Sequence, residues 1–111
     1  MLEKEYDPHE AINYIYTNAP EYAKAKGQLA QLEAYKSSLK AIMMKKSSEQ
    51  SLGGQEREAY AHYEYADLLK GLMVAIEQEE TLKWKLTAAQ MKADIWRSEQ
   101  ASERLGVKTT E

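Results

Sequence analysis

The stretch that decides the fold is residues 65–104, YADLLKGLMVAIEQEETLKWKLTAAQMKADIWRSEQASER. It contains no proline and only one glycine, Gly71, which is typical of an uninterrupted helix. One apolar stripe recurs along it at steps of three and four residues, close to the spacing of a coiled coil. Its members are Leu68, Leu72, Ala75, Ile76, Leu82, Leu86, Ala89, Ala93 and Trp96. We expect this stripe to pack the chain against itself.

A second apolar stripe lies on another face of the same predicted helix. Its members are Met73, Trp84, Ala88, Met91 and Ile95. A short N-terminal helix of about ten residues would cover only about 15 Å of a final helix about 60 Å long. We therefore expect a second subunit to cover this stripe in a homo-oligomer, with the N-terminal helix folding back on it as the alternative.

Two upstream stretches carry the signals that begin a helix. Residues 7–10 (DPHE) combine an N-cap, a proline at the first helical position and a glutamate, which predicts a short helix over residues 8–17. Residues 18–21 (NAPE) repeat the pattern, so we expect a break there and a second helix over residues 20–46. The apolar positions of that second helix are Tyr22, Ala25, Leu29, Leu32, Leu39 and Met43.

Small and glycine residues interrupt the periodicity over residues 47–54 (SSEQSLGG), which predicts a loop or hinge. We expect a short linking helix over residues 55–61 and an antiparallel arrangement of the two long helices. That arrangement brings Lys36 opposite Glu79, the charged residues central to each stripe, and predicts an ion pair. The alternative is that both side chains reach outward to water.

These elements predict an all-α fold, an antiparallel, coiled-coil-like helical hairpin of two long helices with short N-terminal and linking helices. We expect the 111 residues to form a single domain, with a flexible leader over 1–7 and a flexible tail over 105–111. Long helices in so short a chain leave a thin core with much exposed surface, so self-association is expected.

The composition is that of an ordinary soluble protein, with 30% charged residues, 43% hydrophobic residues and a net charge of −3. The absence of cysteine excludes disulfides and thiolate chemistry. There is no secretory leader pattern and no apolar stretch long enough to span a bilayer, so we expect a cytoplasmic protein of the host cell with no membrane partner.

No motif in the chain predicts an enzyme, a metal site or a cofactor. His9, His62 and the group Glu77, Glu79 and Glu80 supply ligand types, but none shows the Glu-x-x-His spacing of helical di-metal sites. Gly53-Gly54 is not followed by the Lys-Ser/Thr of a phosphate-binding loop. Without cysteine, and with both histidines near predicted helix ends, no pair of nucleophile and base is evident.

Nucleic-acid binding is a sharper hypothesis, because residues 19–46 carry six lysines against Glu21 and Glu33. Lysines near tyrosines can hold a single strand through phosphate contacts and base stacking. The candidate residues are Lys24, Lys26, Lys40, Lys45, Lys46 and Arg97. The alternative is a solvated helix surface, since the lysines point in different directions around the helix and the chain is acidic overall.

Four segments resemble a family of small helical proteins of tailed bacteriophages and prophages. They are residues 18–26 (NAPEYAKAK), 39–45 (LKAIMMK), 55–61 (QEREAYA) and 93–98 (ADIWRS), and the resemblance extends from about Ala11 to Leu105. Members of that family are often encoded among phage replication and recombination genes, beside single-strand annealing proteins and exonucleases. The resemblance implies a role in phage DNA metabolism and assigns no functional residues.

Two functions are favoured by these patterns, and a purely structural oligomer, such as an assembly scaffold, is a third possibility. The first is a non-enzymatic phage accessory protein in DNA recombination or replication that binds single-stranded DNA, a recombinase, or both. The second is a phage-encoded inhibitor of a host defence protein or nuclease, which would use Glu77, Glu79, Glu80 and exposed tyrosines as its contact. Added salt is expected to weaken DNA binding steeply and a tyrosine-rich protein interface much less.

Overall fold

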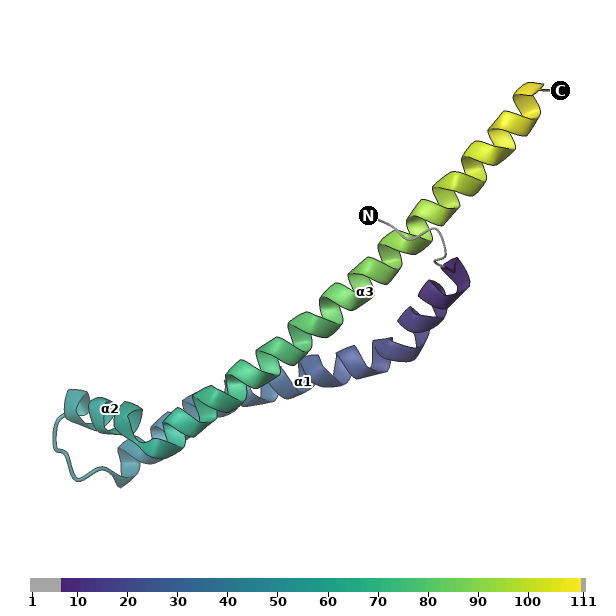
Figure 1. Ribbon diagram of the computed structural model, residues 1–111. Coiled ribbons are helices and arrows are strands. Elements are labelled where there is room, and N and C mark those ends of the chain that lie inside the picture. The colour runs from purple at the N-terminus through teal and green to yellow at the C-terminus, as the bar shows by residue number, and fades with distance from the viewer. Residues whose placement is uncertain (1–6, 111) are drawn as a thin grey trace. The chain divides into compact units, whose positions relative to one another are not determined.

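The computed structural model describes residues 7–110, and all regular secondary structure in that range is α-helical. Helix α1 spans Pro8–Lys46, α2 spans Leu52–Ala61 and α3 spans Tyr63–Thr110 (Figure 1). The predicted all-α class, with two long helices joined through a short one, is confirmed. The described chain divides into two compact units: residues 23–80, here the turn unit, and residues 7–22 with 81–110, here the terminal unit.

Helix α1 begins as the sequence predicts. The carboxylate of Asp7 accepts a hydrogen bond from the backbone N–H of His9 at 2.9 Å, and the Ala11 N–H donates to the Asp7 carbonyl at 3.1 Å. Asp7 therefore caps the helix, with Pro8 in the first helical position, where its missing N–H costs nothing.

The predicted break at residues 18–21 is wrong, because α1 is one helix from Pro8 to Lys46 with Pro20 inside it. The ring nitrogen of Pro20 cannot donate to the carbonyl of Tyr16. Both residues are exposed, so water has access to the unpaired carbonyl. The Asn18 side chain, which the sequence pattern offered as a cap, instead donates to the Tyr14 carbonyl one turn earlier, at 2.9 Å.

The connection after α1 is a shorter loop than predicted. Residues 47–51 are irregular, whereas Gly53 and Gly54 belong to α2, which begins at Leu52 and not at residue 55. The Ser51 hydroxyl caps this helix by accepting a hydrogen bond from the Gly54 N–H at 3.0 Å. A serine cap therefore begins a helix that contains both glycines in its first turn.

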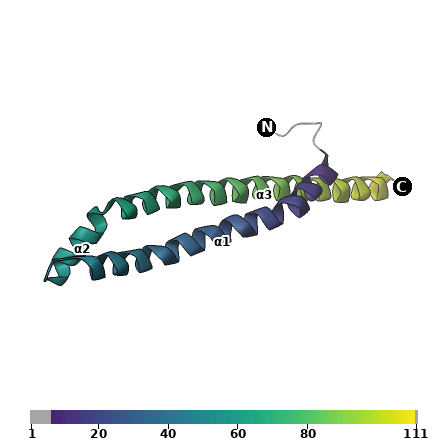
Figure 2. The same cartoon turned by 90° about the horizontal axis from the view of Figure 1, so that it is seen from below.

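The core of the turn unit lies where residues 23–46 of α1 and residues 63–80 of α3 run antiparallel, with α2 at the turn (Figures 1 and 2). Its buried cluster consists of Leu39, Met43, Ala59, Tyr65, Leu68 and Leu72. Leu29, Leu32 and Met44 pack against this cluster and are partly buried. In this unit the predicted apolar stripes of both long helices are the packed faces, with the exception of Ile76, and α2 contributes Ala59.

The register of the two helices differs from the predicted one. Lys36 is exposed and lines a groove with Leu72 and Met73, whereas Glu79 is buried about two turns further along α3. The prediction that Lys36 lies opposite Glu79 is therefore wrong. The length of the connection explains this register. Antiparallel helices pair about the middle of the connecting residues 47–62, which places Lys36 opposite Met73, whereas a pairing with Glu79 would need a longer connection. Ile76, expected in the packed stripe, is instead 45% exposed and lines the groove.

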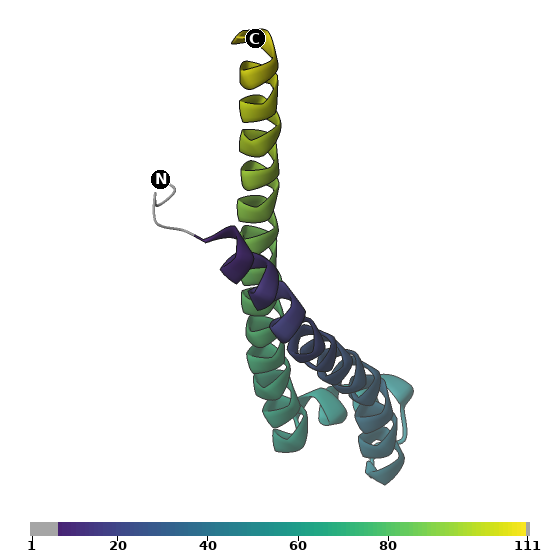
Figure 3. The ribbon, with the colours of Figure 1, turned by 90° about the vertical axis from the view of Figure 1, so that its right-hand side faces the viewer.

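In the terminal unit, the first turns of α1 lie against α3, as Figure 3 shows. Ala11, Ala89 and Ala93 are buried, and the rings of His9 and Trp96 meet with centroids 5.9 Å apart. Small side chains let the two helix backbones approach closely. The start of α1 therefore covers part of the first stripe of α3 and leaves Trp84, Ala88 and Met91 of the second stripe exposed.

The sequence predicts that the last helix ends at Arg104 and that a tail follows over residues 105–111. In the structure, α3 continues to Thr110. Of the predicted leader, residues 1–6 lie outside the described residues, as does Glu111 of the predicted tail.

Candidate protein interaction surfaces

The first candidate surface is in the terminal unit and consists of Trp84, Ala88, Met91 and Ile95, here called the outer patch. These residues recur at steps of four, three and four along α3, so they share one face of the helix. Trp84 is 61% exposed and Met91 58%, Ala88 is exposed and Ile95 is half-buried. The ammonium of Lys83 lies 5.7 Å from the centre of the Trp84 ring, a cation–π contact that leaves most of the ring exposed.

The second candidate surface is a groove in the turn unit between α1 and α3. Its lining residues are Glu33 and Lys36 from α1 and Leu69, Leu72, Met73 and Ile76 from α3. Met73 is 64% exposed, and Leu69 and Ile76 are each 45% exposed. The sequence prediction included Met73 in an interface but missed Leu69 and placed Ile76 in the core. The signal that finds all three is their spacing at i, i+4 and i+7.

The lysines predicted to bind nucleic acid do not form one site. Lys24, Lys26, Lys45 and Lys46 are exposed on α1 within the turn unit. Lys40 is engaged within the fold, because its ammonium lies 3.5 Å from the Glu56 carboxylate and 4.9 Å from the centre of the Tyr60 ring.

The pKa of the Lys40 ammonium is raised above its ordinary value. Contact with Tyr60 has the larger effect, and attraction to the Glu56 carboxylate adds to it. Lys40 thus joins α1 to α2. Two hydrogen bonds act with it at the turn: the Ser47 hydroxyl donates to Glu58 at 2.7 Å, and the Gln55 amide donates to the Glu49 carbonyl at 3.0 Å. Lys40 therefore has a structural role that its spacing in the sequence does not reveal.

Arg97, the remaining predicted nucleic-acid residue, lies in the terminal unit and forms an ion pair with Asp94. Gln90 also donates a hydrogen bond to the Asp94 carboxylate, at 3.2 Å. The hydrogen bond from Arg97, and then that from Gln90, lower the pKa of the Asp94 carboxyl below its ordinary value. The guanidinium therefore already has an anionic partner on its own helix.

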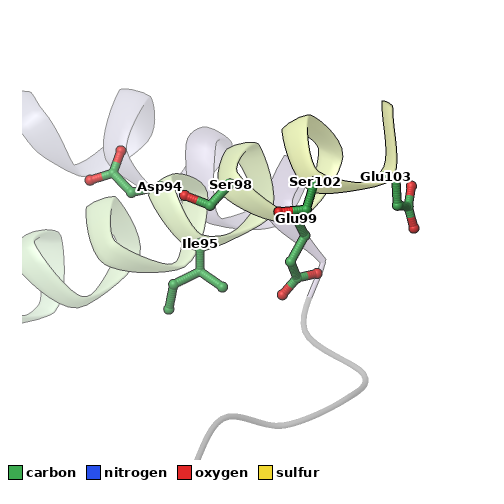
Figure 4. Close-up of a pocket in the computed structure, with 6 residues that line it drawn as sticks. All are labelled: Asp94, Ile95, Ser98, Glu99, Ser102 and Glu103. Carbon is green, nitrogen blue, oxygen red and sulfur yellow. The ribbon is translucent and has the colours of Figure 1, made fainter. Parts of the chain in front are cut away.

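A shallow hollow follows this part of α3 (Figure 4). Its lining residues are Asp94, Ile95, Ser98, Glu99, Ser102 and Glu103, so carboxylates and hydroxyls predominate and Ile95 is the one apolar side chain among them. Within residues 7–110 no three carboxylates or histidines come close enough together to hold a metal ion. The hollow gives the end of α3 an acidic surface, which disfavours nucleic acid there.

The acidic group proposed for the inhibitor function is only partly at the surface. Glu77 is exposed and Glu80 half-buried, whereas Glu79 is buried. Several tyrosines do lie at the surface, and Tyr16 and Tyr63 are the most exposed of the tyrosines that the structure describes. A contact made by the whole acidic group is therefore not available, although Glu77 and the tyrosines remain accessible.

No family model, curated protein or solved structure matches this chain. The resemblance to a phage family stays a prediction from the sequence. Within the described helices, no segment combines the length and the apolar character needed to cross a membrane.

Proposed function

We propose that this protein is a non-enzymatic helical adaptor that associates with itself and binds another protein through the outer patch. Following the resemblance in its sequence, its setting is phage DNA recombination or replication in the host cytoplasm, and its partner class is a recombinase or a host protein. The observation that supports this proposal most strongly is that Trp84 and Met91, seven residues apart on one face of α3, are both exposed.

The outer patch has the chemistry of a protein-binding surface. Tryptophan and methionine are enriched at the centres of protein interfaces, where they contribute much of the binding energy. Apolar residues repeating at a heptad spacing fit the face or groove of another helix. The first turns of α1 pack near Ala89 and Ala93, which leaves Trp84 and Met91 exposed.

Binding of single-stranded DNA is the competing candidate, and exposed Lys24, Lys26, Lys45 and Lys46 favour it. Against it, Lys40 and Arg97 have acidic partners within the fold, and the chain carries a net charge of −3. Phosphate binding depends on accumulated positive charge, so the protein partner is the better supported of the two.

The test is cross-linked capture from bacterial cells that express a phage single-strand annealing protein, with a tagged chain as bait. Wild type is compared with Trp84→Asp and with Tyr16→Asp, a matched control because Tyr16 is an exposed aromatic residue of the same unit outside the patch. We expect wild type and Tyr16→Asp to capture the annealing protein or a host protein that Trp84→Asp loses.

Equal capture by all three proteins would contradict the role of the outer patch. The DNA candidate is measured in parallel, by fluorescence anisotropy of a labelled single-stranded oligonucleotide at low and at physiological salt. Saturable, salt-sensitive binding that is lost in a Lys24→Glu, Lys26→Glu variant, together with no captured protein, would replace the proposed function with DNA binding.

A further inference from the structure

The groove of the turn unit is a candidate binding site for a third helix. Leu69, Met73 and Ile76 form a stripe on α3 beside the buried Leu72, and all three are about half-exposed or more. Glu33 and Lys36 of α1 form the opposite wall of the groove. A helix that carries a matching apolar stripe would complete the burial of this one.

Two opposite charges flank the stripe on its other side. Lys70 follows Leu69 and Glu77 follows Ile76, so the two are seven residues apart and lie on one face of α3. Both are exposed, and neither forms an ion pair within residues 7–110. A lysine and a glutamate at equivalent positions of successive heptads are the arrangement that selects partner and orientation in coiled coils.

We infer that this face binds a second copy of the chain, with the two α3 helices antiparallel about a twofold axis that passes between Met73 and Ile76. The inference rests on the self-association in the proposed function and specifies its surface. The twofold brings Met73 of each copy against Ile76 of the other. It also brings Lys70 of each copy beside Glu77 of the other, so each dimer has two pairs of opposite charges.

The charges select this register over its neighbours. Sliding one copy by a heptad in one direction brings the two Lys70 side chains together, and sliding it in the other direction brings the two Glu77 side chains together. A parallel arrangement places Lys70 near Tyr65 and Glu77 near Leu72, with no opposite charge for either. The pattern is therefore complementary to itself in one antiparallel register, which favours a second copy over an unrelated helix.

The test is sedimentation equilibrium of the full chain and two single variants, Lys70→Glu and Glu77→Lys. Each variant places like charges in both pairs, and we expect its dimer dissociation constant to rise by about tenfold. An equimolar mixture of the two restores two opposite-charge pairs in a heterodimer, which we expect to form with close to wild-type affinity. Circular dichroism verifies that each variant keeps the wild-type helix content.

A second pair of variants tests the apolar part of the contact. Met73→Glu is expected to yield monomers, whereas Val74→Glu is the matched control, because Val74 is the adjacent residue, about half-exposed, and points away from the groove. Loss of dimers in both variants alike would overturn the assignment to this face.

The outcomes separate this inference from the proposed function. A wild-type dimer that responds neither to the single charge changes nor to mixing overturns the assigned surface and leaves self-association standing. A wild-type chain that stays monomeric at all concentrations overturns the assigned surface and also the self-association in the proposed function. Capture of a partner through Trp84 is measured in the separate cross-linking experiment.

Discussion

The Ser51 hydroxyl accepts a hydrogen bond from the Gly54 N–H at 3.0 Å, and a Cβ atom on Gly54 would lie only 2.9 Å from that same oxygen. It would also lie 3.0 Å from a carboxylate oxygen of Glu49. Gly54 is buried, and no described glycine has a positive φ. The constraint at Gly54 is therefore space beside the cap of α2 and not backbone conformation.

We expect Gly54→Ala to have a free energy of unfolding about 1 kcal/mol lower than that of Gly53→Ala, because both gain helix propensity but the methyl group at position 54 displaces the capping hydroxyl. The control is Gly53→Ala, since nothing lies within 4 Å of a Cβ at that position. There the gain in helix propensity should raise stability by up to about 1 kcal/mol. Urea denaturation followed by circular dichroism measures both, and equal changes in the two variants would contradict the argument.

The side chain of His62 caps α3, because its Nδ1 accepts a hydrogen bond from the Glu64 N–H at 3.1 Å. His62→Ala should lower stability by about 1 kcal/mol through loss of this acceptor. His62→Asn keeps a short acceptor at the cap and should recover most of the loss. If thermal unfolding gives the same midpoint for the alanine and asparagine variants, the capping role of the imidazole is refuted.

Leu39 has the most deeply buried large side chain of the core cluster, at 3% exposed, whereas Ile42 on the same helix is 42% exposed. Leu39→Ala should cost about 2–5 kcal/mol, since it removes buried contacts and leaves a cavity between α1, α2 and α3. Ile42→Ala should cost less than half as much. Chemical denaturation of both variants checks the difference, and comparable losses would mean that the packed face of α1 is misplaced.

The ion pair of Asp94 and Arg97 gives a prediction for pH. Because the folded-state pKa of Asp94 is lowered, the pair contributes stability above the ordinary aspartate pKa of about 3.9 and loses it as the pH falls through the folded pKa. The Arg97→Gln variant loses the hydrogen bond that contributes most to lowering the pKa of Asp94. The midpoint of the Asp94 carboxyl resonance, followed by NMR, should therefore move upward in this variant, and an unchanged midpoint would refute the pairing.

The sequence was a good guide to the helices and to their packed faces. Apolar periodicity located α3, and Leu68, Leu72, Ala89 and Ala93 of the predicted stripe are buried. Periodicity works here because a residue's direction around a helix depends only on its position along that helix. The cap at Asp7 could also be predicted from the sequence, since its partner is the N–H of His9, two residues away.

The breaks between helices were less predictable. Residues 18–21 carry a pattern for starting a helix, yet α1 continues through Pro20, and residues 53–54 carry a pattern for a loop, yet they lie in α2. A short motif states which local conformations are permitted. Which one is adopted depends on the packing of the flanking residues, which a window of four residues does not contain.

The sequence by itself determined that this chain is helical, where its long helices lie and which residues share a stripe, because these properties follow from residue spacing within one helix. The tertiary structure decided which stripes of α1 and α3 meet and at which register, so that Lys36 and Met73 line one groove. It also left Ile76 exposed beside them. It also engaged Lys40 with Glu56 and Tyr60 across α1 and α2. Register depends on the length and path of the connection through α2, and no periodicity within a single helix records that.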